Sequence, residues 1–193
     1  SMNLYRGNIG AIKCNYTDNL MAVNEISIIK NILNKLPHKV HYKPYLQENK
    51  RYTDKDPILK LLPKYKNLIL LNKNIDARYL LESFRIIVTS HASSTISWAI
   101  MSKKPIIFIN DKNNIPLSPI AEEHFKKSLF VFNAGDKGFE KDIINFLSQK
   151  IETIEKIYMK KEKSRNIMID QFITSYSKGA GRRSSKVILK EYF

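Results

Sequence analysis

Short apolar runs rich in β-branched residues alternate along this chain with stretches of helical periodicity. The runs are Val40–Tyr42, Leu68–Leu71, Arg85–Thr89 and Pro105–Ile109, with Ile9–Cys14 and Ser128–Phe132 as further candidates. Strands and helices in alternation are typical of βαβ units, which place their strands in a parallel sheet. Because the runs are nearly all apolar, both faces of the strands should be covered. The pattern predicts an α/β fold, with a Rossmann-like parallel sheet and helices on both of its faces.

Between these runs, apolar residues recur at helical spacing. The predicted helices are Met21–Leu36, which Pro37 ends; Ile58–Leu62, which ends near Pro63; a helix through Tyr79–Leu81 with Asp76 as its N-cap; a helix through Trp98 and Met101 that Ser93 or Ser94 caps; and a helix that opens at Asp136 or Lys137 and runs to Leu147. From residue 151 the pattern is helical to the end, with a break near Ser177–Gly181. We therefore predict a Rossmann-like domain over residues 3–150 and a C-terminal helical tail over 151–193, packed on the same domain.

The length of 193 residues suits one large domain, since domains usually have roughly 100 to 200 residues. Cys14 is the only cysteine, which excludes an intramolecular disulfide and a cysteine-based metal cluster. No apolar run approaches the roughly 18 residues of a membrane helix, and no signal peptide is evident. These observations favour a cytoplasmic protein.

The formal net charge of +15 indicates a nucleic acid, an anionic membrane surface or a phosphate-bearing small molecule as partner. A drift toward lysine in an AT-rich coding sequence would explain the charge equally well. The lysines are spread along the chain and are densest from residue 160 onward. This distribution suits peripheral association with anionic lipid at the inner face of the cell membrane, or steering of an anionic substrate. It does not suit nucleic acid, because no basic helix stripe, RNP-like motif or zinc-finger pattern is present.

The turn after the Arg85–Thr89 run carries three consecutive hydroxyl residues, Ser93, Ser94 and Thr95. Where a helix follows a strand, its first backbone N–H groups are unpaired and can bind phosphate. Ligands of parallel α/β sheets bind at this carboxyl end of the strands. We therefore predict a phosphate site here, to which His91 could donate a hydrogen bond. The alternatives are that one serine only caps the helix and that His91 is structural.

A second turn, Lys43-Pro44, follows the Val40–Tyr42 run. The proline favours an extended exit from the strand, and the lysine would be a point charge directed at a phosphate. By itself, the pair is as well explained by a surface lysine beside a proline. Its occurrence two strands before the Ser-Ser-Thr turn favours a shared phosphate site.

Together, these turns and the order of the elements resemble the C-terminal half of GT-B glycosyltransferases. The pattern is similar to that of bacterial enzymes of surface-polysaccharide synthesis, namely the Kdo and sialic-acid transferases with His-Pro and Ser-Ser motifs and the CDP-glycerol glycerophosphotransferases of teichoic-acid synthesis. The resemblance covers roughly residues 9 to 147, about the length of one Rossmann-like half. The motifs on which it rests are short. It differs from many relatives in having Lys43 where they have histidine.

The resemblance implies that Lys43-Pro44 and Ser93–Thr95 hold the phosphate of a cytidine-nucleotide donor, CMP- or CDP-linked, with no other cofactor. The reaction would transfer a sugar or polyol phosphate to a glycan or lipid-linked acceptor during synthesis of capsule, lipopolysaccharide or teichoic acid. A GT-B enzyme has two such halves and this chain has the length of one, so the N-terminal GT-B domain would be a missing partner. The chain could then be inactive alone.

Weaker candidates for nucleotide contacts lie at two further turns. Tyr16 and Thr17 follow the first predicted strand, where a simple helix cap is equally compatible. Asn110, Glu122 and Glu123 follow the Pro105–Ile109 run, where relatives often contact ribose or base. No metal site is predicted, because no HExxH motif or aspartate-rich pair occurs. The catalytic residues stay unassigned.

Three other functions are compatible with parts of the sequence. A UDP-sugar transferase or epimerase would have a related fold, but its usual ribose-binding acidic residue is not evident. A nucleic-acid-binding module would explain the charge alone. A flavodoxin-like regulator would carry acidic clusters at the strand ends, where this chain has hydroxyl groups and a lysine.

Overall fold

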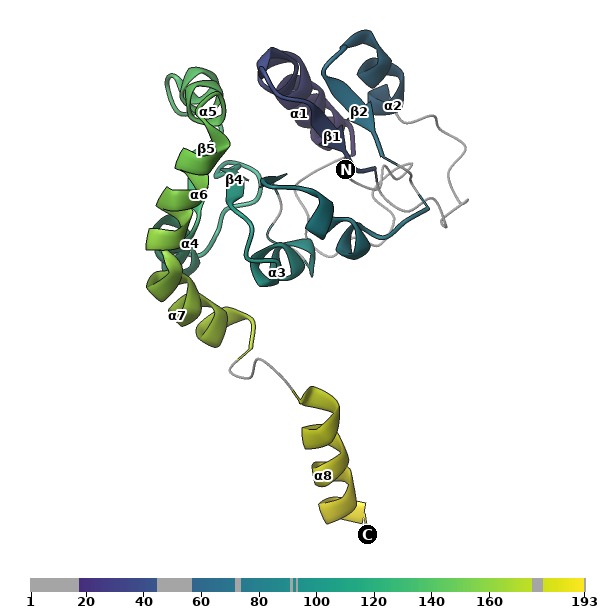
Figure 1. The fold of residues 1–193 in the computed structure, drawn as a ribbon, viewed down its shortest axis with the longest axis vertical. Coiled ribbons are helices and arrows are strands. Elements are labelled where there is room, and N and C mark those ends of the chain that lie inside the picture. Colours follow the sequence, from purple (N-terminus) through teal and green to yellow (C-terminus); the bar gives the residue numbers. More distant parts are fainter. Residues whose placement is uncertain are drawn as a thin grey trace.

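The strands in the described part of the chain are parallel. The computed structural model describes residues 18–44, 57–71, 74–90, 92, 94–174 and 179–192. The strands are β1 (Val40–Tyr42), β2 (Leu68–Leu70), β3 (Ile87–Thr89), β4 (Ile106–Asn110) and β5 (Phe130–Asn133). β1 pairs with β2, and a second sheet has the order β3-β4-β5 (Figure 1). The predicted parallel α/β fold is confirmed, whereas the strand predicted at Ile9–Cys14 lies outside the described residues.

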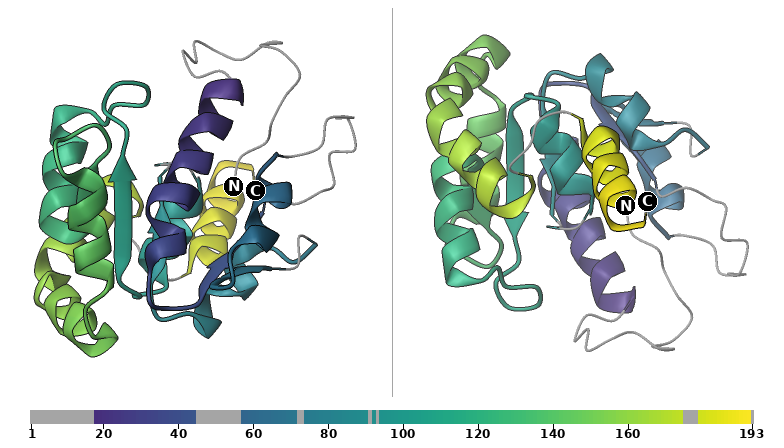
Figure 2. Two further views of the ribbon diagram at one scale, coloured as in Figure 1. Left: turned by 90° about the horizontal axis from the view of Figure 1, so that it is seen from above. Right: turned by 90° about the horizontal axis from the view of Figure 1, so that it is seen from below.

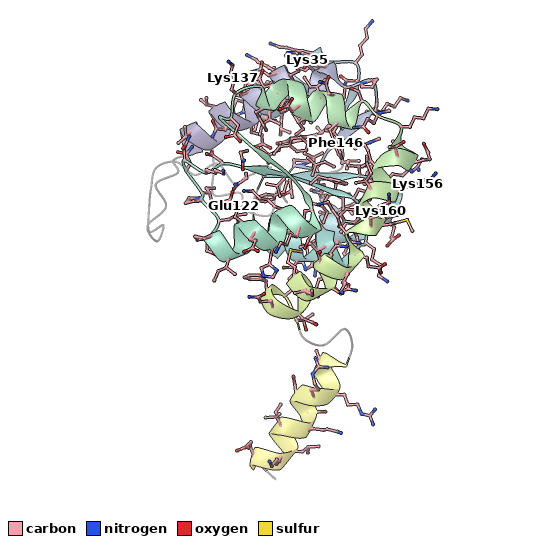
Figure 3. The ribbon with its side chains drawn as sticks, turned by 90° about the vertical axis from the view of Figure 1, so that its left-hand side faces the viewer. Lys35, Glu122, Lys137, Phe146, Lys156 and Lys160 are labelled. Carbon is pink, nitrogen blue, oxygen red and sulfur yellow. The ribbon has the colours of Figure 1, made fainter. Side chains whose placement is uncertain are left out.

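Helices alternate with these strands. The α-helices are α1 (Asp18–Asn31), α2 (Pro57–Leu61), α3 (Ser94–Met101), α4 (Pro119–Ser128), α5 (Phe139–Leu147), α6 (Ile151–Lys160), α7 (Glu162–Phe172) and α8 (Ala180–Tyr192). The described residues also form the 3-10 helices η1 (Leu33–Lys35), η2 (Leu62–Lys64), η3 (Ala77–Tyr79) and η4 (Leu81–Ser83). Figure 3 shows α1 and α5 on one side of the β3-β4-β5 sheet and α4 on the other. Both faces of this sheet are therefore covered, as the apolar strand runs predict.

The core is centred on β4, the middle strand of its sheet, in which all five residues are buried. On one face, Phe108 contacts the ring of Phe125 in α4, with centroids 5.1 Å apart. Burying one isoleucine or phenylalanine side chain contributes about 1.5–3 kcal/mol. The run of isoleucines in β4 is therefore a principal source of the stability of this sheet.

α4 was not among the helices predicted from the sequence. It begins at an N-cap, Ser118, whose hydroxyl accepts a hydrogen bond from the backbone N–H of Ala121 at 3.3 Å, and Pro119 follows in the first turn. Such a start is a common helix signal. Ser128, predicted to open the sixth strand, is the last residue of this helix, and β5 begins only at Phe130.

Two predicted helices differ in the structure, one in its type and the other in its start. Asp76 is an N-cap as predicted, and its carboxylate accepts a hydrogen bond from the backbone N–H of Arg78 at 2.8 Å, but the helix it caps is the short η3. α5 begins at Phe139, with Gly138 as its N-cap at a φ of 85°. The left-handed conformation favours glycine at this position.

α6 and α7 are packed on the domain through buried Ile154, Tyr158 and Met168. In both views of Figure 2 they lie at the opposite end of the molecule from α2 and β2. α8 differs, since all of its described side chains except Arg183 are exposed. In Figure 1 it stands apart from the rest of the fold. Within the described ranges, no helix is both long and apolar enough to cross a membrane.

Two cations of this C-terminal region lie at the carboxyl end of α4. The Lys161 Nζ donates to the backbone carbonyls of Lys126 and Lys127 at 2.9 and 3.3 Å. The guanidinium of the buried Arg165 donates to the carbonyl of Ser128 at 3.5 Å and to that of Tyr158 at 3.0 Å. Cations stabilise the last turn of a helix, where carbonyl groups have no intrahelical partner. The buried charge is therefore paired with a helix end.

We predict that truncation of Ile154 to alanine destabilises the protein by about 2–5 kcal/mol, because the side chain is fully buried and its removal leaves a cavity. Ile157 lies on the same helix and is 36% exposed, so Ile157→Ala is the matched control, with an expected loss below about 1 kcal/mol. Urea unfolding measures both. Equal losses for the two variants would contradict the assigned packing of α6.

Stability should also fall at high pH through Tyr158. Burial raises the pKa of the Tyr158 phenol to about 12, against about 10 in an unfolded chain. The contribution of the Tyr158 phenol to the free energy of unfolding is fully present below the pKa of the unfolded chain. It is lost as the pH rises toward the pKa of the folded protein, because the unfolded chain releases this proton first. Tyr158→Phe should therefore remove part of the loss in unfolding free energy in this pH window. Chemical denaturation at a series of pH values tests this, and identical profiles for both proteins would refute it.

Candidate functional site

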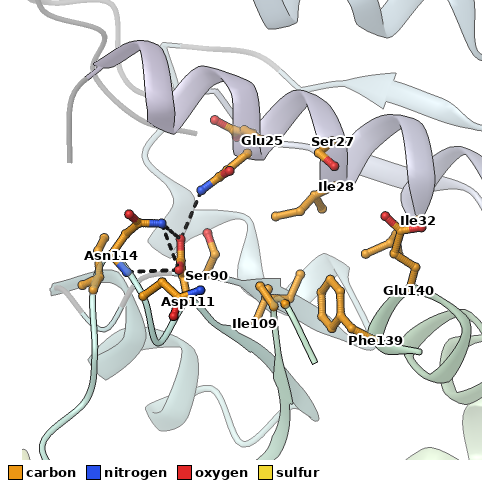
Figure 4. Close-up of a pocket in the computed structure, with 15 residues that line it drawn as sticks. Glu25, Ser27, Ile28, Ile32, Ser90, Ile109, Asp111, Asn114, Phe139 and Glu140 are labelled. Carbon is orange, nitrogen blue, oxygen red and sulfur yellow. Dashed lines mark hydrogen bonds between the residues drawn. The ribbon is translucent and has the colours of Figure 1, made fainter. Parts of the chain in front are cut away.

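A cavity of about 280 Å³ lies at the carboxyl ends of β3, β4 and β5, beneath α1 (Figure 4). Its lining comes from α1 (Asn24, Glu25, Ser27, Ile28 and Ile32), from the residue after β3 (Ser90), from the end of β4 and its following turn (Ile109, Asp111, Asn113, Asn114 and Ile115), and from the β5–α5 turn and the start of α5 (Ala134, Gly135, Phe139 and Glu140). Ligands of open parallel sheets bind at this edge. The cavity is therefore the candidate site.

Asp111 organises one wall of the cavity. Its carboxylate accepts hydrogen bonds from the Asn24 Nδ2 at 3.1 Å, from the Asn114 Nδ2 at 2.9 Å and from the Asn114 backbone N–H at 3.2 Å. Figure 4 shows the bond from α1 to Asp111 and the bonds between Asp111 and Asn114 within the turn after β4. Hydrogen bonds to a charged acceptor are stronger than neutral ones. Asp111 thereby ties α1 to the end of the central strand and fixes the positions of both amide side chains.

Two further carboxylates at the cavity come from helices. Glu25 of α1 accepts a hydrogen bond from the hydroxyl of Tyr42 at the end of β1. Glu140 of α5 accepts one from the Asn31 Nδ2 at 2.8 Å. The described lining residues thus include three carboxylates, Glu25, Asp111 and Glu140, and no lysine, arginine or histidine. Carboxylates suit ligands with hydroxyl or amide groups, which can donate hydrogen bonds to them.

The other walls of the cavity are apolar. Ile28 and Ile32 of α1, Ile109 of β4 and Phe139 of α5 contribute to them. Mostly apolar walls with a few placed polar groups are typical of small-molecule sites. The arrangement suits a ring that bears hydroxyl groups on its edge, such as a ribose or another sugar.

The predicted phosphate turn begins at this cavity. Ser90, the first residue after β3, lines it, and α3 begins four residues later at Ser94. Thr95 is exposed on the first turn of α3. His91 and Ser93 lie outside the described residues, as do Tyr16 and Thr17. The chain between the cavity and the amino end of α3 is therefore short. The phosphate contacts of the hydroxyl groups in this turn stay a prediction.

Lys43 and Pro44 follow β1, outside the cavity lining. The Lys43 side chain is half-buried, and its Nζ donates to the carbonyl of Pro44 at 2.7 Å. Burial lowers the pKa of Lys43, and the charge of Asp76 opposes this effect. Asp76 itself forms an ion pair with Arg78 at 3.1 Å. Lys43 thus shares its surroundings with an acidic group from the turn after β2.

Asn110 and Glu122 also lie outside the cavity lining. Asn110 is fully buried, and its Nδ2 donates to the Asn133 Oδ1 at 3.0 Å. Glu122 on α4 forms ion pairs with Lys126 at 2.8 Å and Lys112 at 3.3 Å. Hydrogen bonds from these two ammonium groups hold the pKa of Glu122 below its usual value. The neighbouring Glu123 pairs with a lysine on the exposed face of the same helix.

The residues that shape the cavity were not predicted as site residues from the sequence, although Ser90 belongs to the turn that follows the Arg85–Thr89 run. One signal was available, because Asn110–Asn114 is a polar run directly after a buried strand. No comparable signal was available for Asn24, Glu25 and Glu140. Each lies on a helix that is far from β4 in the sequence, so no local pattern indicates its contact with the cavity. The Asn24–Asp111 bond joins residues 87 positions apart.

Within the described ranges, no cluster of three or more histidine, cysteine, aspartate or glutamate residues has the geometry to hold a metal ion. Comparison of the chain with protein-family models, with curated protein sequences and with solved structures finds no match.

Replacing Asp111 by alanine should destabilise the fold by about 1–3 kcal/mol, because Asn24 and Asn114 lose a charged acceptor. Glu123→Ala, which removes an exposed carboxylate paired with Lys127, is the control, with an expected loss of about 0.3–0.5 kcal/mol. Thermal unfolding of the two variants measures the difference. A loss for Asp111→Ala no larger than for the control would show that the wall does not depend on this carboxylate.

Proposed function

We propose that this chain is the donor-nucleotide-binding domain of a GT-B-type glycosyltransferase of bacterial surface-carbohydrate synthesis. The observation that carries the proposal is the cavity at the carboxyl ends of β3–β5, one turn away from the amino end of α3. The resemblance of the Lys-Pro and Ser-Ser-Thr turns to those of cytidine-nucleotide-dependent transferases adds the class of donor. The proposed donor is therefore a CMP- or CDP-linked sugar or polyol.

Different parts of the donor would bind in two regions of the site. Glu25, Asp111 and Glu140 at the cavity would accept hydrogen bonds from hydroxyl groups. The first N–H groups of a helix have no intrahelical partner and attract anions, and α3 begins at Ser94. The donor would thus place hydroxyl-bearing rings in the cavity and its phosphate at the Ser94 end of α3.

In the reaction, an acceptor hydroxyl would attack the transferred group while the bond to the nucleotide phosphate breaks. Negative charge then develops on the departing phosphate. Backbone amides of α3, with Lys43 from the end of β1, would stabilise this charge, and such electrostatic stabilisation can contribute several kcal/mol. The base that activates the acceptor would come from a second GT-B domain. The proposed role of this chain is therefore donor binding and stabilisation of the leaving group.

A thermal-shift series with CMP, CDP, UDP and a short oligonucleotide tests the proposal. A ligand at 100 times its Kd should stabilise the fold by about 2.7 kcal/mol. We expect cytidine nucleotides to stabilise the protein and the oligonucleotide to have no effect.

The double variant Ser94→Ala, Lys43→Ala should lose the response to nucleotides. Ser184→Ala, Lys190→Ala makes the same two changes on α8 and should retain it. Stabilisation by the oligonucleotide alone, or an unchanged nucleotide response in the first variant, would refute the proposed site.

A further inference from the structure

α8 presents apolar side chains that are not covered by the described part of the chain. Val187, Ile188 and Leu189 are 60%, 52% and 59% exposed. The helix stands apart from the strands and from α1–α7 (Figure 1). A single exposed aliphatic residue is ordinary on a protein surface, whereas adjoining ones indicate an interaction site.

The opposite side of α8 is basic. At about 100° per residue, Arg182, Arg183, Lys186 and Lys190 fall within an arc of roughly 100° around the helix axis. Glu191 is the only acidic residue of the helix. The helix is therefore amphipathic and carries a net positive charge, in a chain whose total charge is +15.

The other residues of the helix span roughly 200°, from Val187 through Ile188 to Leu189, and include alanine, glycine, serines and the single acid. Arg182 adjoins Leu189 at one margin of this arc, and Arg183 adjoins Val187 at the other. Long basic side chains at such margins can place their stems over an apolar layer and their charges among anionic groups. This is the distribution found in helices that lie in a membrane interface.

A protein groove is less suited to this helix than a lipid surface. Helices that dock in grooves use anchors spaced i, i+3, i+4 and i+7 along one narrow stripe. Val187, Ile188 and Leu189 are consecutive, so they point in three directions over a wide arc. A fluid bilayer requires no such register. The positive charge complements anionic headgroups, which attract each nearby lysine or arginine.

We propose that α8 binds peripherally to a bilayer that contains anionic phospholipids. Val187–Leu189 would lie at the boundary between headgroups and acyl chains, with the basic residues among the headgroup phosphates. The inference does not depend on the proposed nucleotide site.

The test is co-sedimentation of the full chain with vesicles of phosphatidylcholine alone and of an equimolar mixture with phosphatidylglycerol. We expect binding to the mixed vesicles only, and weaker binding at high salt. Val187→Ser, Ile188→Ser, Leu189→Ser should weaken the binding at least about ten-fold. Lys186→Gln and Lys190→Gln should weaken it about five-fold each.

The matched control is Lys137→Gln, Lys141→Gln, which removes two exposed charges at the β5–α5 turn and on α5. It should reduce binding much less than Lys186→Gln, Lys190→Gln. Equal losses would show that total charge, not α8, is responsible. Binding that the serine variant retains in full would also overturn the proposal. So would light scattering that shows a dimer dissociated by the serine variant, since the occupant would then be a second copy of the chain.

Discussion

Burial of β4 on both faces is the constraint on which the rest of the structure depends. Its residues alternate between the side of α4, where Phe108 contacts Phe125, and the side of α1, where Ile109 reaches the cavity. Side chains alternate between the two faces of a strand. Asn110 and Asp111, the two polar residues at the end of β4, therefore point to opposite sides. Asp111 emerges on the side of Ile109 and lines the cavity, whereas Asn110 is buried against Asn133. Packing of the apolar part thus decides which polar group a ligand can reach.

Most of the fold could be predicted from the sequence because buried parallel strands are continuous apolar runs. α4 could not be recognised in this way. Its apolar residues are few, and a mixed charged surface surrounds them. The signals that did exist were local, namely the Ser118 cap and the pairing of Glu122 and Glu123 with lysines one turn later. Hydrophobic periodicity alone is insufficient for a helix that buries only a narrow face.

The site was less predictable than the fold, because it is assembled by tertiary contacts. The crevice rule points to the carboxyl edge of the sheet, and a cavity lies there, lined by Ser90 from the turn after β3. The three carboxylates of the cavity lining were not predicted. Glu25 and Glu140 reach it from two helices that precede and follow the sheet, and no local pattern relates them. Lys43 and Glu122 were predicted as ligand-binding residues from their places in the sequence, but each has a partner within the fold. The Lys43 Nζ donates to the carbonyl of Pro44, and Glu122 forms an ion pair with Lys126.

The contacts of Lys161 and Arg165 with the end of α4 have a consequence for where the domain stops. The sequence pattern changes near residue 150, which makes that point an attractive place to shorten the chain. A protein cut there would expose the final carbonyls of α4 and remove Tyr158 and Met168 from the interior. α6 and α7 therefore pack as part of the same core, and a shortened chain that keeps this core should extend through Phe172.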